Sequence, residues 1–323
     1  MTPDPTLSAL SDHLFSISVA LYSVAVLAFC AQLAFGRRTA SVSEPELVAA
    51  GGAPLPPQAP GAAAPEPVSS RRWGRLGVLV TALGALTHVG VLVARGLSVG
   101  RLPWGNMYEF ATAMVLVAVV AFLILALRLP AVRHLGAFVL GPAVLAMVLV
   151  GLFLYTDAGP LVAALRSSWL AVHVTAAITG FGIFFVSSIA SIAYLVRTRY
   201  DAKLATGGAR SDSTVGRLPS AATLDRVAHR TAVFGFPIWT FAVIAGAIWA
   251  ESAWGRFWGW DPKETWAFIA WVVYAAYLHA RTTAGWRGRP AAWVNVTGLV
   301  VMVFNLLYVN MVSTGLHSYA GVS

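Results

Sequence analysis

The sequence has a single cysteine among its 323 residues, Cys30, and that cysteine lies within an apolar run. A disulfide within the chain and a C-x-x-C redox pair are therefore both excluded, and any thiol chemistry on the outer face of a membrane must use cysteines of another protein. Charged residues are also scarce, at 11%, while hydrophobic residues reach 58%. This composition excludes an ordinary soluble domain and predicts an all-α integral membrane protein.

Eight apolar stretches have the length expected of membrane-spanning helices, which need roughly 20 residues each. The first stretch is too long for a secretory signal and lacks a basic leader, so we expect a retained span. No internal repeat and no large polar domain interrupt the pattern, so any chemistry belongs in the membrane or at its surface. The expected helices cover residues 14–35, 76–94, 107–127, 135–154, 169–196, 232–250, 265–280 and 292–312.

The basic residues are distributed very unequally when eight spans alternate between the two sides of a membrane. Seventeen of the 22 Lys and Arg residues fall on one side. By the positive-inside rule that side is cytoplasmic, which places both termini on the outer side. Anionic lipid accounts for the net charge of +9, so nucleic acid is not an expected partner. The remaining five are Arg95, Arg101, Arg166, Arg256 and Lys263.

The domain organisation follows from composition. Residues 1–36 form the first transmembrane helix. Residues 37–75 are rich in Ala, Pro, Gly and Ser and are expected to be a disordered cytoplasmic linker. A seven-helix domain then spans residues 76–323, and a tryptophan-rich outer loop of this domain covers 251–266. A basic connection between the fifth and sixth spans includes a short amphipathic stretch, 221–230, that leads into the sixth.

Four of the twelve tryptophans lie in residues 254–266, WGRFWGWDPKETW, between two apolar runs. We call residues 254–266 the tryptophan segment. Its charged residues exclude it from hydrocarbon, so it is expected to lie along the outer membrane surface and to bind a large flat ligand. Asp261, Pro262 and Glu264 also match a helix start, with Asp261 as N-cap. The positive end of that helix then favours an anionic group of the ligand. Arg256 and Lys263 are either cationic contacts for that group or, more often at such positions, ordinary interfacial charges.

Two histidines reach the same side as the tryptophan segment. His173 lies one turn into the fifth span, and His317 follows the eighth. An isolated histidine at such a place is more often a structural residue than a ligand. Two that converge on one aromatic segment favour a haem site, because imidazole is the usual axial ligand of haem iron and tryptophan packs on porphyrin. His88 and His279 lie inside spans, where polar groups are often functional. For His279, near the cytoplasmic end, an equal alternative is a polar residue at the interface, and for His88 it is a buried hydrogen bond to a neighbouring helix.

Several motifs together carry a family resemblance. The chain resembles the CcsA/ResC-type membrane subunit, also called CcsB, of the System II cytochrome c biogenesis machinery, within the haem-handling superfamily. Trp254, Gly255, Trp258, Trp260, Asp261 and Glu264 fit the WWD domain of that superfamily without a gap. RLPWGNMYEF at 101–110, WLAVHV around His173 and GLHSYA around His317 extend the match over most of the chain from the second span onward.

The resemblance implies a subunit of a cytochrome c synthase complex in the bacterial cytoplasmic membrane, with the WWD loop extracytoplasmic. Haem b would be held between His173 and His317 against Trp254, Trp258, Trp260, Asp261 and Arg256. His279 would be an inner haem-iron ligand, and no residue of this chain would act as a catalytic nucleophile. The implied partners are a ResB-type membrane subunit, a C-x-x-C-H apocytochrome c and thiol-reducing proteins. The role of His88 stays open.

Three alternatives remain at this point. A haem exporter or chaperone without ligation activity predicts the same ligands and differs only in activity. A bis-His electron-transfer subunit requires haem that stays bound, usually with His pairs inside the bilayer. A structural scaffold predicts that the outer histidines and Trp258 and Trp260 tolerate alanine with only folding losses.

Overall fold

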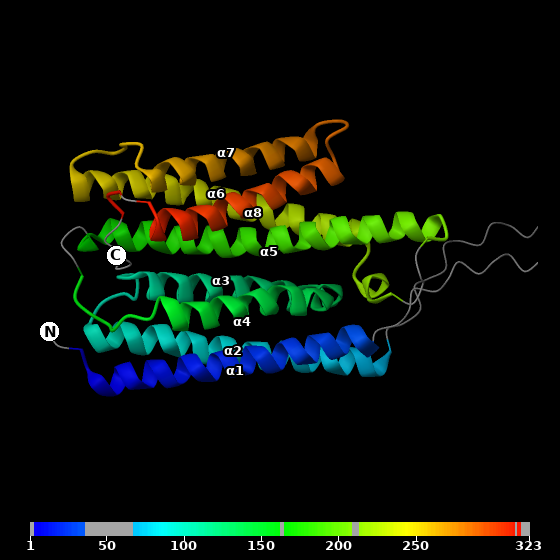
Figure 1. Cartoon of the computed structure of the whole chain (residues 1–323), viewed down its shortest axis with the longest axis horizontal. Coiled ribbons are helices and arrows are strands. Elements are labelled where there is room, and N and C mark those ends of the chain that lie inside the picture. The colour runs from blue at the N-terminus through cyan, green and yellow to red at the C-terminus, as the bar shows by residue number, and fades with distance from the viewer. Residues whose placement is uncertain (1–2, 36–66, 162–164, 209–212, 314, 318–323) are drawn as a thin grey trace, which may run out of the picture.

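The computed structural model describes residues 3–35, 67–161, 165–208, 213–313 and 315–317. Within these ranges the chain forms eight α-helices and two short 3₁₀ helices. All eight α-helices run side by side along one axis (Figure 1). Their bounds are α1 Pro5–Phe35, α2 Val68–Val99, α3 Met107–Arg128, η1 Pro130–Leu135, α4 Gly136–Phe153, α5 Ser168–Ala205, η3 Thr214–Arg217, α6 Ala221–Trp254, α7 Pro262–Thr282 and α8 Arg289–Met311.

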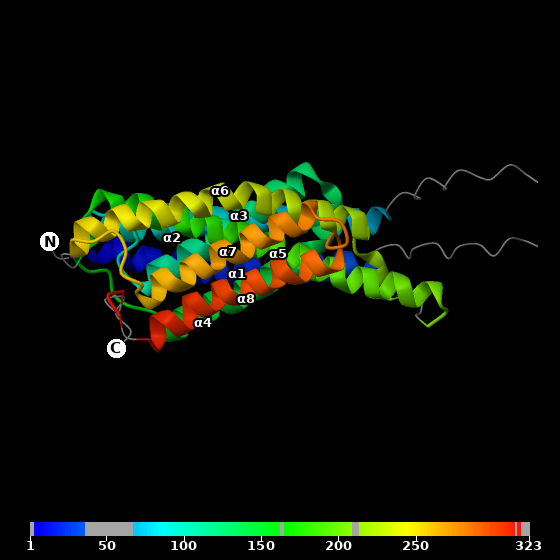
Figure 2. The ribbon, with the colours of Figure 1, turned by 90° about the horizontal axis from the view of Figure 1, so that it is seen from above.

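The predicted all-helical membrane architecture is confirmed. Seven of the eight α-helices are long and apolar enough to cross a membrane, so the protein is a multi-pass membrane protein. The helix outside that group is α7, which has 21 residues and includes charged groups near both ends, at Lys263, Glu264 and Arg281. It nevertheless lies alongside the other helices over most of their length (Figure 2).

Two helix boundaries differ from the sequence prediction. Residues 68–75, which composition assigns to the linker, form the first two turns of α2. Packing against α1 explains this extension, because Ser70 is buried and donates a hydrogen bond to the carbonyl oxygen of Gln32. The rest of the linker, 36–66, lies outside the described residues. The amphipathic stretch 221–230 is the first part of α6, continuous with the sixth span.

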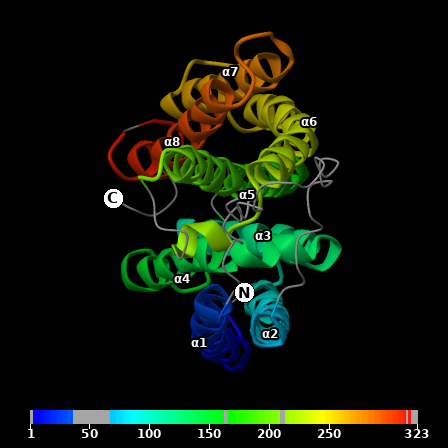
Figure 3. The same ribbon diagram turned by 90° about the vertical axis from the view of Figure 1, so that its right-hand side faces the viewer.

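The helices form stacked layers when seen end-on (Figure 3). One outer layer is the α1/α2 pair, α3 and α4 form the next, and α5 separates them from α6, α7 and α8. Helix α5 is central, because it packs against α3, α6 and α8. The α2–α3 and α6–α7 connections lie at the same end of the bundle, together with the end of α8 (Figure 1). We call this the tryptophan end; its assignment to the outer side remains a prediction.

Close contact between α3 and α5 depends on a buried glycine. A Cβ atom at Gly182 would lie 2.7 Å from Val117 Cγ1 and 2.8 Å from the backbone nitrogen of Ala118. We expect Gly182→Ala to lower the free energy of unfolding by about 1–3 kcal/mol, because backbone atoms of α3 would have to move. Gly141→Ala in α4 is the control, since nothing lies within 4 Å of its Cβ position. Thermal unfolding in detergent compares the two variants, and equal losses would contradict this account.

Candidate functional site

The loop between α6 and α7 is fixed at each end by a helix cap. Helix α6 ends at Trp254 and is capped by Gly255, which has a left-handed φ of 69°, and α7 begins after its N-cap Asp261. Glu264 completes a capping box, because its Oε2 accepts hydrogen bonds from the backbone nitrogens of Gly259 and Asp261, at 2.9 and 3.1 Å. The predicted helix start at Asp261 is therefore confirmed. The non-helical part of the predicted 251–266 loop is limited to residues 255–261.

Asp261 also joins this loop to the segment after α8. Its Oδ1 accepts hydrogen bonds from the backbone nitrogen of Lys263 and from His317 Nδ1, both at 2.9 Å. Its Oδ2 accepts a hydrogen bond from the backbone nitrogen of Leu316 at 2.8 Å. Burial by itself would raise the pKa of Asp261, but the hydrogen bonds from His317, Lys263 and Leu316 outweigh it and lower the pKa to about 2. Asp261 is thus a carboxylate that holds His317 in place.

His173 is oriented by helix α6. Its Nδ1 lies 2.8 Å from the carbonyl oxygen of Ala242. A carbonyl oxygen only accepts hydrogen bonds, so Nδ1 carries the proton and Nε2 carries the lone pair. The ring can approach α6 only because residue 246 is glycine, where a Cβ atom would lie 2.7 Å from His173 Cε1.

The two histidines meet at a tryptophan that the sequence argument missed. Trp249 is 1% exposed; its ring is stacked on His173 at 5.9 Å between centroids and lies edge-on to His317 at 5.7 Å. Trp254 lies 4.8 Å from Trp249 and 5.0 Å from His317. The structure therefore brings His173, His317 and Trp254 into one aromatic cluster, although 144 residues separate the histidines. In the sequence Trp249 looks like any other residue of an apolar span.

Two small cavities adjoin this cluster, and His173, His317, Trp249 and Lys263 line both of them. Their volumes are about 80 and 50 Å³. Space of this size admits only a few water molecules, so a large flat ligand requires side chains such as Trp249 to move. The donor set still fits haem iron, because ligating histidines usually donate their other ring N–H to a carboxylate or a backbone carbonyl. His317 and His173 have these two kinds of acceptor at Nδ1.

Three other predicted site residues, Trp258, Trp260 and Arg256, lie in the α6–α7 loop outside this cluster. Trp258 lines the smaller cavity and packs edge-on against Trp260 at 5.7 Å. Trp260 is 66% exposed and has a φ of 57°, a strained conformation for a residue with a side chain. The Arg256 guanidinium folds over the loop backbone at Gly259 and lines neither cavity. The tryptophans thus form a surface that continues outward from the buried cluster.

His279 is not part of the cluster. It is exposed in the last turn of α7, about 27 Å along the helix from Asp261 at 1.5 Å per residue. His88 is also separate, because it is fully buried and its Nδ1 lies 3.1 Å from the hydroxyl of Tyr22 in α1. The structural reading of His88, a buried hydrogen bond to a neighbouring helix, matches this geometry.

The connection between α2 and α3 closes the cluster from the side of α3. Glu109 is fully buried and forms ion pairs with Arg95 and Arg101, at 3.3 and 2.7 Å. It also accepts a hydrogen bond from the backbone nitrogen of Gly105 at 2.7 Å. These bonds hold the connection that carries Trp104, a lining residue of the larger cavity. Residues 101–110 are one of the motifs that carry the family resemblance, but the sequence alone does not explain the charges of Arg101 and Glu109.

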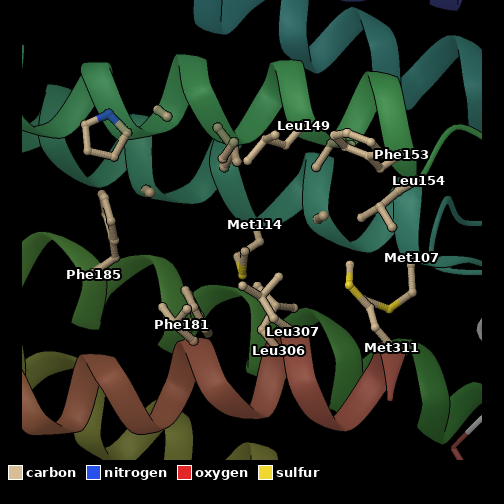
Figure 4. A pocket seen from close by; sticks show the side chains of 18 residues that line it. Met107, Met114, Leu149, Phe153, Leu154, Phe181, Phe185, Leu306, Leu307 and Met311 are labelled. Carbon is tan, nitrogen blue, oxygen red and sulfur yellow. The ribbon is translucent and has the colours of Figure 1, made fainter. Parts of the chain in front are cut away.

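A separate apolar cavity of about 560 Å³ lies between α3, α4, α5 and α8 (Figure 4). Figure 4 shows Met107 and Met311 at one end and Phe185 toward the other. In the part of the chain that the structure describes, its lining includes no titratable side chain and none of the predicted site residues. Met107 also lines the larger of the two histidine cavities, so the two spaces share one wall.

Comparison with known proteins identifies the class to which this fold and site belong. The model of the family described as cytochrome C assembly protein matches residues 104–317. That range includes His173, the tryptophan segment and His317. The chain therefore belongs to the cytochrome c assembly protein family, and within it to the CcsA type that the sequence resemblance indicated.

Curated relatives specify the type more narrowly. The chain is 37% identical over 272 residues to the cytochrome c biogenesis protein CcsA of Parasynechococcus marenigrum, over 78% of this chain and 88% of the relative. It is 35% identical over 296 residues to CcsA of Gloeobacter violaceus, over 77% and 87% of the two chains. The protein is thus a membrane protein of cytochrome c biogenesis, and its family implies haem handling.

A solved structure shares the fold. The cytochrome c haem lyase CcmF superposes with a TM-score of 0.62 at 16% sequence identity, over 93% of this chain. At this identity the similarity concerns the fold alone. The chain spans less than half of CcmF, of which 46% is covered.

Proposed function

We propose that this chain is the haem-holding membrane subunit of a cytochrome c synthase complex. In this proposal haem b is its substrate, and His173 and His317 supply the two axial nitrogens. The observation that carries the proposal is the pair of Nδ1 hydrogen bonds, from His173 to a carbonyl oxygen and from His317 to a carboxylate. Each bond fixes the tautomer in which Nε2 has the lone pair that iron needs.

The chemistry assigned to this chain is positioning. Haem supplies iron and two vinyl groups, and a C-x-x-C-H apocytochrome supplies two thiols. Each thiol adds across a vinyl double bond: a carbon–sulfur bond forms, the thiol proton goes to the neighbouring carbon, and no electron is transferred. Residues of this chain hold the ring in place. Trp254, Trp258 and Trp260 pack against its face, and Arg256 supplies a cationic side chain from the α6–α7 loop. Asp261 acts through His317.

The proposed setting is the bacterial cytoplasmic membrane, with the tryptophan end on the outer side and a ResB-type subunit as membrane partner. Because the chain has only one cysteine, other proteins are proposed to supply the reduced thiols. His279, exposed about 27 Å from the cluster, is assigned to a separate inner site that a partner subunit completes. In this proposal a haem moves between the two ends of the bundle.

The test is the absorption spectrum of the purified chain, with and without its membrane partner. We expect a low-spin b-type spectrum in the wild type, and at least a tenfold loss of bound haem in His173→Ala and in His317→Ala. Imidazole is expected to restore part of the spectrum. His13→Ala is the matched control, because His13 is exposed on α1 at the same end of the bundle. Spectra of both outer-histidine variants that match the control would refute the ligand assignment.

His279→Ala separates the two proposed sites. We expect it to keep the outer-site spectrum when haem is added to the purified chain, and to lower the haem that copurifies with the complex. A haem exporter and a synthase subunit are expected to give the same spectra in all these variants. Covalent haem attachment to a C-x-x-C-H peptide, measured in the complex, distinguishes them.

A further inference from the structure

Lys263 lies where three helices and both histidine cavities meet. It is the second residue of α7, and its side chain lines both cavities together with His173, Trp249 and His317. Its Nζ donates a hydrogen bond to Oδ1 of Asn310 in α8 and lies 5.8 Å from the ring centroid of Phe110 in α3. The ammonium group is therefore turned inward, toward the cluster.

No carboxylate pairs with this ammonium group among the described residues. Two carboxylates are close to it in sequence. Glu264 lines the smaller cavity and accepts hydrogen bonds from the backbone nitrogens of Gly259 and Asp261. Asp261 accepts hydrogen bonds from the backbone nitrogens of Lys263 and Leu316 and from His317. Among the described residues, none that lines the larger histidine cavity is acidic. An ammonium group has three donors, of which Asn310 takes one. Asp261 attracts this half-buried ammonium group electrostatically but forms no ion pair with it, so an anionic ligand group at the cavity would add a direct partner.

A second hydrogen-bond donor at the larger histidine cavity also has no acceptor within the described chain. Trp104 lines this cavity, and its buried indole Nε1–H makes no hydrogen bond within the described chain. Asn310 in turn donates from its amide nitrogen to the carbonyl oxygen of Leu306 at 2.6 Å, which keeps its own oxygen toward Lys263. The cavity is thus cationic, with donors from α7 and from the α2–α3 connection.

We propose that Lys263, with Trp104, binds a carboxylate of the planar macrocycle and thereby sets its orientation in the histidine site. This inference rests on the proposed function, since it concerns the same ligand. A charge-assisted hydrogen bond between ammonium and carboxylate is among the stronger polar contacts in proteins. The acidic edge of the ring then faces α3 and α8. The opposite, vinyl-bearing edge then lies on the side of the smaller cavity, where Trp254 and Trp258 pack against the face of the ring.

The experiment compares two ligands that differ only in their carboxyl groups. The full-length chain in detergent is titrated with ferric protoporphyrin IX and with its dimethyl ester, and binding is followed by the Soret band. We expect the wild type to bind the diacid about tenfold to a hundredfold more tightly, the range of one hydrogen bond to a charged group. Lys263→Gln is expected to lose this preference while its affinity for the ester stays unchanged.

Three further variants make the result decisive. Lys263→Arg is expected to keep the preference, because it keeps the charge. Trp104→Phe removes only one donor and is expected to lower the preference severalfold, and it replaces Lys263→Gln if that variant does not fold. Arg166→Gln is the control, since Arg166 is an exposed cation near the start of α5 that lines neither histidine cavity.

Two outcomes separate this inference from the proposed function. If the wild type binds diacid and ester equally, or Lys263→Gln weakens both to the same extent, the Lys263 assignment is overturned while the histidine site stands. If neither compound gives a spectrum that depends on His173 and His317, the histidine site itself is refuted.

Discussion

Glu109→Gln is expected to destabilise the protein by about 3–5 kcal/mol, the cost of breaking a buried ion pair from one side. Glu109 is fully buried, and its carboxylate faces both Arg95 and Arg101. Arg95 is itself 1% exposed and also donates to the carbonyl oxygen of Thr156. Removal of the negative charge leaves this guanidinium buried without a counter-charge, and an amide cannot replace the bidentate acceptor.

The consequence of Glu109→Gln extends to the histidine cluster. Gly105 N–H donates to Glu109, so the connection that carries Trp104 loses one of its anchors. Thermal unfolding in detergent should show a fall of roughly 5–15 °C, as expected from this energy and the size of the chain. Asp225→Asn is the matched control, because its pair with Arg281 is partly exposed, at 27% and 15% of the two side chains. We expect that control to cost at most about 1 kcal/mol. Equal losses in the two variants would show that Glu109 has no special role.

The parts of this structure that local sequence determines were predictable. Eight apolar runs predicted eight helices, because hydrocarbon requires each backbone to satisfy its own hydrogen bonds. The capping box at Asp261 was predictable as well, since its donors and acceptors lie within four residues. The start of α2 was not, because the Arg-rich residues 68–75 become helical through packing on α1, which no local pattern encodes.

The functional cluster depends on contacts between distant residues, and these were predictable only in outline. Topology placed His173 and His317 at the same end of the bundle. It did not indicate Trp249, which reaches both rings only because Gly246 lets α5 approach α6. The partner of Lys263 is 47 residues away in α8, and the pairing of Arg95 with Glu109 spans a connection whose path no motif describes.

Asp261→Ala is expected to have the second large effect, because it removes three functions of one carboxylate. The variant loses the N-cap of α7, worth about 1 kcal/mol, together with the bonds from Leu316 and His317. Loss of the acceptor at His317 Nδ1 is expected to weaken haem binding about 10–100-fold, as for other residues that orient a metal ligand. Ser220→Ala is the control, since Ser220 caps α6 at the opposite end and touches neither histidine. Haem titration of the two variants measures the difference.

Asp261→Asn isolates the contribution of the charge, and its effect depends on pH in a defined direction. The pKa of Asp261 is about 2 in the folded protein, below the usual value of about 3.9 in an unfolded chain. A depressed folded pKa means that the ionised form stabilises the fold, fully above about pH 4, and that this stability is lost as the pH falls toward 2. After allowance for solvent screening we expect about 1–2 kcal/mol. The stability of the wild type should therefore fall more steeply than that of Asp261→Asn between about pH 4 and pH 2. Parallel curves over this range would show that hydrogen bonding by a neutral side chain is enough to hold His317.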